Sequence, residues 1–182
     1  EATMTASAGL EEWIEAEYRI AAMRMLRSVS ATSMVHQRPL FGQAIRPARG
    51  SVVASPVPGA YDPEPDYFFH WYRDAAVVAE AVSLLIADGT LAEDGPAMIA
   101  DMVDFASGLD RLDGRAIAAS VDHGGAVAES VRQFLRPREE LAAVTADTIR
   151  AETRCNPDGT IDKIRWARPQ FDGPALRALT FI

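Results

Sequence analysis

The sequence predicts an all-α fold in which helices pack as successive hairpins. Between Leu10 and about Met34 the apolar residues recur at intervals of three and four, which is typical of an amphipathic helix. Residues 75–87 are apolar nearly all round, so a helix there has to be covered on most sides. After Gly89, the sequence Asp94-Gly95-Pro96 starts a more amphipathic helix. Alternation of buried and half-buried helices predicts an array of helical hairpins.

A long connection separates the first of these helices from the second. Residues 36–66 contain proline and glycine throughout, and a loop of this length in a compact domain is usually functional or disordered. We favour a functional loop with a short strand at residues 51–55, and we expect a short β-hairpin in the fold. Further along, we expect helical pieces at 126–135 and 139–153, separated at Pro137, and a turn at Asn156-Pro157-Asp158-Gly159.

The connection ends on Asp66-Tyr67-Phe68-Phe69-His70-Trp71-Tyr72-Arg73-Asp74, an aromatic run in a chain that is only 8% aromatic. The residues that follow are helical, so Arg73 and Asp74 should lie at a helix N-terminus. Such a run more often belongs to the core than to a binding site. In that case Arg73 and Asp74 would be a solvated helix start, where the helix dipole stabilises the acid. Trp and Tyr rings, however, can stack on the C–H faces of a sugar, while Arg and Asp bind its hydroxyls.

A second stretch of the same character lies near the end of the chain. Trp166-Ala167-Arg168-Pro169-Gln170-Phe171 leads into Asp172-Gly173-Pro174-Ala175-Leu176-Arg177-Ala178. Asp172 is expected as the N-cap of a helix, with Pro174 in its first turn. Aromatic and arginine side chains thus precede a helix start twice, which favours a binding site over core packing alone.

Together the two stretches resemble the glucoamylases, glycoside hydrolase family 15. The resemblance is clearest from about Gly50 through Ala81 and again from Asn156 onward. It implies that residues 1–182 form the N-terminal portion of a glucoamylase-like catalytic domain, a partial (α/α)6 barrel truncated at both ends. The rest of that catalytic domain would then be the principal partner of these helices.

The resemblance also implies a substrate and the residues that bind it. The family releases β-D-glucose, with inversion, from the non-reducing ends of α-1,4-glucans such as starch and maltooligosaccharides. Carried over by position, the substrate-binding residues are Tyr67, Trp71, Arg73, Asp74, Trp166, Ala167 and Arg168. Ala167 stands where the family more often has glycine, which weakens one backbone contact.

Inverting glycosidases need two carboxyl groups, one acid and one base, roughly 6.5–9.5 Å apart. In the resembled family both are glutamates, and both are expected beyond Ile182. Asp74 cannot replace either of them, because its family role is to hold the sugar. We therefore expect no catalytic residue in this sequence, and we expect the isolated chain to be inactive and unstable. The alternatives are a relative that cuts α-1,6 or trehalose bonds, and a non-catalytic glucan-binding or regulatory module.

Composition excludes several other classes. The formal net charge of −8 with no basic block argues against nucleic-acid binding. The lone Cys155 and the scattered His36, His70 and His123 give no metal-ligand spacing and no internal disulfide, so neither metal nor cofactor is expected. No apolar run is long enough for a membrane helix, and no signal peptide is visible. Secretion would suit a polymeric substrate, although the sequence leaves the localisation open.

Overall fold

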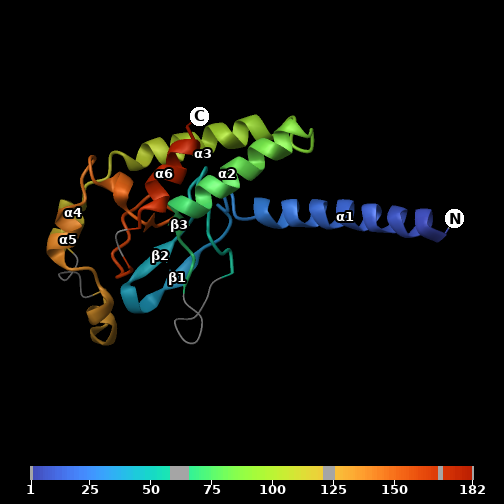
Figure 1. The fold of residues 1–182 in the computed structure, drawn as a ribbon. Coiled ribbons are helices and arrows are strands. Elements are labelled where there is room, and N and C mark those ends of the chain that lie inside the picture. Colours follow the sequence, from blue (N-terminus) through green and yellow to red (C-terminus); the bar gives the residue numbers. More distant parts are fainter. Residues whose placement is uncertain (1, 58–65, 121–125, 168–169, 182) are drawn as a thin grey trace.

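The computed structural model describes residues 2–57, 66–120, 126–167 and 170–181. Its secondary structure is mostly helical, as predicted, with two small antiparallel strand pairs (Figure 1). The elements in chain order are α1 (Ala2–Leu26), β1 (His36–Arg38), η1 (Pro39–Phe41), β2 (Gln43–Ile45), β3 (His70–Trp71), α2 (Tyr72–Ala87), α3 (Gly95–Leu109), α4 (Gly114–Ser120), η2 (Glu129–Phe134), α5 (Arg138–Ala142), η3 (Ile149–Ala151), β4 (Arg154–Cys155) and α6 (Asp172–Leu179).

Helix α2 is the centre of the helical layer. It forms a hairpin with α3 and also packs against α6, which is distant in sequence (Figure 1). The buried face of α2 is formed by small and branched side chains, including Ala75, Ala79 and Val82. Gly89, with φ of +87°, ends the first arm of this hairpin, and Asp94-Gly95-Pro96 begins the second, as predicted.

The largest core cluster of the described residues includes the end of the aromatic run in β3. Phe69 and Trp71 pack there against Leu141, Ile149 and Ile164, all less than 5% exposed. Burial of these side chains ties the aromatic run to α5 and to the segments that follow it. Phe68, Phe69 and Tyr72 are therefore core residues, as the simpler interpretation of the run required.

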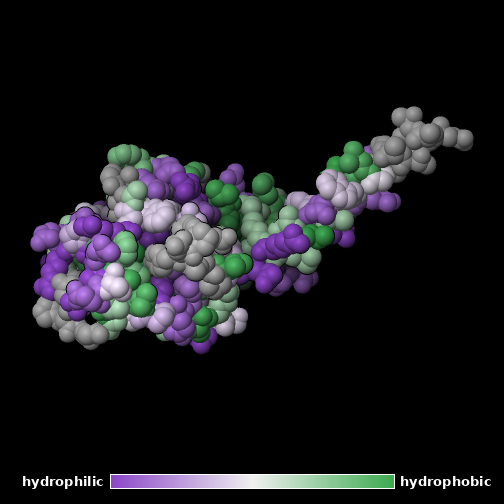
Figure 2. All heavy atoms as spheres, turned by 90° about the horizontal axis from the view of Figure 1, so that it is seen from below, coloured by the Kyte–Doolittle hydropathy of each residue, from purple (hydrophilic) through white to green (hydrophobic). Residues whose placement is uncertain are grey.

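Helix α1 projects away from the rest of the molecule as a long arm (Figure 1). Leu10, Trp13 and Ile14 are each more than half exposed, so the apolar stripe of this helix is largely uncovered by the described residues (Figure 2). The helix ends at Leu26, eight residues before the predicted end near Met34. Ser30 takes a positive φ of 50°, and Val29 instead forms an isolated bridge to Val52.

The β-hairpin exists, but it is formed by β1 and β2 at residues 36–45, whereas the strand expected at 51–55 is reduced to the bridge at Val52. The hairpin turns through η1 and Gly42, which has φ of +61°. A Cβ at Gly42 would lie 2.6 Å from the carbonyl oxygen of Ala126, so both the backbone angle and the close approach require glycine.

The helix expected at 139–153 is wrong in length, because α5 ends at Ala142. The Thr148 hydroxyl donates to the Ala143 carbonyl at 2.7 Å and accepts from the Thr145 amide at 2.8 Å. These local bonds compete with helix continuation. Residues 126–135 contain the 3₁₀-helix η2 rather than an α-helix, and α4, which no sequence signal predicted, packs on α5.

Candidate functional site

The two stretches singled out in the sequence meet at the N-terminal ends of α2 and α6. Arg73, in the first turn of α2, donates through Nη1 to Oδ2 of Asp172 at 2.8 Å. Asp172 is the first helical residue of α6 and Phe171 is its N-cap, so the predicted cap was one residue late. The carboxylate nevertheless lies at the positive end of the helix dipole, and Arg73 lowers its pKa further.

Asp74 is the second polar side chain of this turn. Its Oδ2 atom makes no hydrogen bond with any described residue, and Arg73 Nε lies 3.8 Å away. Burial raises the pKa of Asp74, and the nearby Arg73 opposes that shift. A partly buried carboxylate oxygen without a hydrogen-bond partner is an acceptor that a sugar hydroxyl could use.

Three predicted aromatic residues form a cluster beside this turn. The ring centroids of Trp71 and Trp166 are 5.3 Å apart at an interplanar angle of 89°, and Tyr67 lies 6.1 Å from each of them. Trp71 is buried, Trp166 is half-buried and Tyr67 is 41% exposed. The cluster therefore presents Tyr67 and part of Trp166 to solvent, with Trp71 beneath them.

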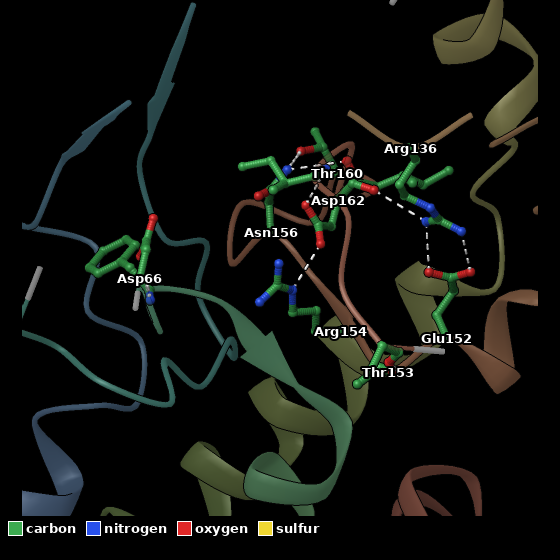
Figure 3. Close-up of polar contacts among 12 residues, drawn as sticks. Asp66, Arg136, Glu152, Thr153, Arg154, Asn156, Thr160 and Asp162 are labelled. Atoms are coloured by element: carbon green, nitrogen blue, oxygen red, sulfur yellow. Dashed lines mark hydrogen bonds and ion pairs between the residues drawn. The ribbon is translucent and has the colours of Figure 1, made fainter. Parts of the chain in front are cut away.

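A buried arginine underlies the aromatic cluster. The Cζ atom of Arg154 lies 4.5 Å from the Trp166 centroid, 5.3 Å from Trp71 and 3.8 Å from Phe69. Arg154 is the cross-strand neighbour of Trp71 in the β3–β4 pair, which explains how it comes under the rings. Its Nε donates to Oδ2 of Asp162 at 2.8 Å (Figure 3). Cation–π contacts of this kind favour fixed ring positions.

Asp66 anchors the start of the aromatic run. Its carboxylate accepts from Arg38 Nε at 2.5 Å, from the Phe68 amide at 2.8 Å, and is 3.0 Å from His36 Nε2. Burial alone would raise the pKa of Asp66, but the hydrogen bond and charge of Arg38 hold it below the ordinary value. The β1 strand thus fixes the segment that leads to Tyr67.

A pocket of about 490 Å³ lies next to this turn. Arg73 and Asp74 line one side of it, the C-terminal end of α1 lines another through Arg24, and the segment around Val53 lines a third. The volume is in the range of small-molecule sites, and polar side chains on an otherwise apolar wall are typical of them.

Two predicted residues stand apart from this arrangement. Ala167 is exposed, and its carbonyl oxygen accepts from the Thr153 hydroxyl at the long distance of 3.5 Å. Arg168 lies outside the described residues. Sequence reasoning missed Asp172 as the partner of Arg73 and missed Arg154 entirely. Asp172, like Asp74, is an acid at a predicted helix start, so the sequence offered a signal that these two helix starts could meet. Nothing in the sequence marks Arg154.

Metal-binding clusters of His, Cys, Asp and Glu are absent among the described residues. His70 is buried and its Nδ1 accepts from the Val52 amide at 3.0 Å, so it is a structural residue. Cys155 is buried as a free thiol. In the part of the chain that the structure describes, no helix has the length and hydropathy to cross a membrane.

Comparison with known families gives a match to the model described as glycosyl hydrolases family 15, over residues 22–104. The match covers less than half of the chain, and over that part the chain is similar to this family. The matched region contains the pocket-lining residues, the aromatic run and α2, but it ends within α3 and before Trp166.

Curated relatives extend the similarity over nearly the whole chain. Glucoamylase S1 of Saccharomyces cerevisiae is 24% identical over 177 residues, which are 97% of this chain and 18% of that protein. A probable glucoamylase of Schizosaccharomyces pombe is 27% identical over 175 residues, 96% of this chain and 30% of that protein. The chain thus spans less than a third of the length of these relatives. No solved structure gives a significant match.

Proposed function

We propose that this chain is the N-terminal portion of a glucoamylase-like catalytic domain that binds the terminal glucose of an α-1,4-glucan. The observation that carries the proposal is the meeting of two stretches about a hundred residues apart. Arg73 pairs with Asp172 at 2.8 Å, while Trp71 and Trp166 lie with their rings 5.3 Å apart. Core packing accounts for the tryptophan contact, but it gives no reason for Arg73 and Asp74 to line a pocket beside the paired helix starts.

Each side chain has a role in this proposal that its surroundings support. Asp74 accepts a glucose hydroxyl through its unbonded oxygen, and Arg73 donates to a neighbouring hydroxyl while Asp172 keeps its guanidinium oriented. Tyr67 and Trp166 offer exposed ring surface to the C–H face of the sugar. Ala167 and Arg168 are assigned to the same site by family resemblance.

The reaction proposed for the protein at its natural length is exo-acting hydrolysis with inversion, which releases β-D-glucose. It needs an acid and a base on opposite sides of the scissile bond with a water between them. Asp74 is not proposed for either role, because it is assigned to hold the sugar. The two catalytic glutamates are instead expected in the rest of the catalytic domain, so the 182 residues alone are expected to bind weakly and to hydrolyse nothing.

The test is to follow the protein at its natural length with maltoheptaose by proton NMR of the anomeric signals. We expect β-glucose to appear first, and we expect substrate blocked at the non-reducing end to remain intact. Release of α-glucose first, or cleavage of the blocked substrate, would contradict inverting exo-hydrolysis.

Parallel reactions with dextran and trehalose separate the proposed α-1,4 activity from that of relatives acting on other bonds. Faster cleavage of either substrate would reassign the linkage while leaving the glucose site in place. Binding of maltoheptaose without any release would favour the second candidate, a non-catalytic glucan-binding module.

A further inference from the structure

A small cavity of about 10 Å³ lies between α2, α3 and α6, behind the first turn of α2. Its apolar wall includes Ala75 and Ala106, but His70, Tyr72 and Arg177 also line it. All three of these polar side chains are less than 10% exposed. A void lined only by apolar side chains stays dry, whereas a polar one of this size can hold a single water molecule.

Two of the residues that line this cavity each have a buried polar atom with no hydrogen-bond partner among the described residues. These atoms are the Tyr72 hydroxyl and Nε of Arg177. Buried groups of this kind are nearly always bonded, to protein or to ordered water, because leaving them unbonded forfeits their hydration without compensation. The two unbonded atoms belong to residues that line the same cavity. This is a second, independent indication that the cavity holds a ligand.

The remaining groups determine which ligand fits. Arg177 already donates through Nη2 to the Ala106 carbonyl at 2.7 Å and to Asp110 at 3.0 Å. The positive charge of Arg177 excludes a cation as the ligand. Asp110 already balances that charge, so the cavity does not require an anion. His70 accepts from the Val52 amide through Nδ1, so its ring proton is on Nε2 and the ring is neutral. Burial and the charge of Arg177 lower the pKa of His70 to about 3, consistent with this state.

We propose that this cavity is a binding site for one internal water molecule, which accepts a hydrogen bond from Arg177 Nε and donates one to the Tyr72 hydroxyl. Such a water joins the first turn of α2 to the middle of α6. These are the helices that present Arg73 and Asp172 to the candidate site. The bridge therefore helps to set the spacing of the two helix starts, and it does not depend on what the site binds.

A crystal structure of the protein at its natural length, at about 1.5 Å resolution, tests the proposal directly. We expect a water peak within about 2.6–3.2 Å of both Tyr72 Oη and Arg177 Nε. An empty cavity, or a direct bond from either atom to another protein group, would overturn it.

The variant Tyr72→Phe gives an independent test through the sign of its effect on Tm. If the hydroxyl binds the water, its removal lowers Tm by about 2 °C, because a hydrogen bond is lost. If the hydroxyl is truly unbonded, its removal leaves Tm unchanged or raises it, which would contradict the proposal. Tyr67→Phe is the matched control, since the Tyr67 side chain is 41% exposed and loss of its hydroxyl should leave Tm unchanged.

Discussion

Replacement of Arg154 by methionine should separate the two roles of this residue, in stability and in ring placement. The side chains of Arg154 and Asp162 are 2% and 1% exposed, and their Nε–Oδ2 distance is 2.8 Å. Methionine keeps much of the apolar stem but leaves the Asp162 carboxylate buried without this cation. Removal of one member of a buried ion pair costs about 3–5 kcal/mol, whereas each cation–π contact is worth about 0.5–2 kcal/mol. The ion pair should therefore dominate the loss of stability.

The double variant Arg154→Met with Asp162→Asn removes both charges. Asparagine can still accept the Ile164 amide, which now bonds Asp162 Oδ1 at 2.8 Å. Because the double variant leaves no unpaired charge of this pair in the interior, we expect it to regain more than half of the lost free energy of unfolding. Urea denaturation of the protein at its natural length measures this recovery.

The position of Trp166 should not recover with stability. Trp166 lies in a segment without regular secondary structure, 4.5 Å from the Arg154 guanidinium, so tertiary contacts place it. Fluorine NMR of 5-fluorotryptophan protein should show a shifted Trp166 resonance in both the single and the double variant. The control is Arg136→Met, which breaks the buried pair of Arg136 with Glu152 and should move that resonance less. An unmoved Trp166 resonance, or a loss below about 1 kcal/mol in the single variant, would refute this account of Arg154.

Two further predictions concern backbone strain and pH. Gly50 has φ of +80° and an added Cβ would lie 1.9 Å from the Asp101 carbonyl oxygen, so Gly50→Ala should cost several times more than Gly89→Ala, where φ is +87° but the space is open. Comparison of their denaturation midpoints checks this, and equal losses would contradict the close approach. His70 has its pKa lowered to about 3 by burial, so the unfolded state binds one more proton than the folded state between about pH 6.5 and 3. Stability should fall by up to about 1.4 kcal/mol per pH unit as pH drops through that window, and His70→Asn should remove this contribution; an unchanged pH slope in that variant would contradict it.

The helices that place the site were largely predictable, because local signals coincide there. Gly89 marks the end of the first helix of the α2–α3 hairpin, and Gly95-Pro96 marks the start of the second. The spacing of apolar residues predicts the helices themselves. The aromatic run also predicted the start of α2, because its Arg-Asp pair leads directly into the helix. Where the pattern was only periodic, as beyond Leu26 of α1, the boundary was wrong.

The buried charges could not be predicted, because their partners come from distant segments. Arg38 bonds Asp66, which is 28 residues away in the sequence. Arg136 pairs with Glu152, which is 16 residues away (Figure 3). All four side chains are nearly fully buried. Arginine in a sequence is normally read as a surface residue. Only the fold shows that these arginines are buried. It also shows that Arg154 lies beneath the rings of Trp71 and Trp166.

The measurement that tests the central claim most directly is calorimetric titration of a sulfur-linked maltotriose, whose glycosidic bonds resist hydrolysis, into the protein at its natural length, with and without Asp74→Asn. Burial already disfavours the charge of Asp74, so the neutral amide should leave the fold intact. Loss of a charged hydrogen bond to the sugar should weaken binding about 10- to 100-fold. Asp113→Asn, at an exposed ion pair with Arg115, is the control and should bind like the wild type. Equal affinity in wild type and Asp74→Asn would contradict the assignment of this helix start as the glucose site.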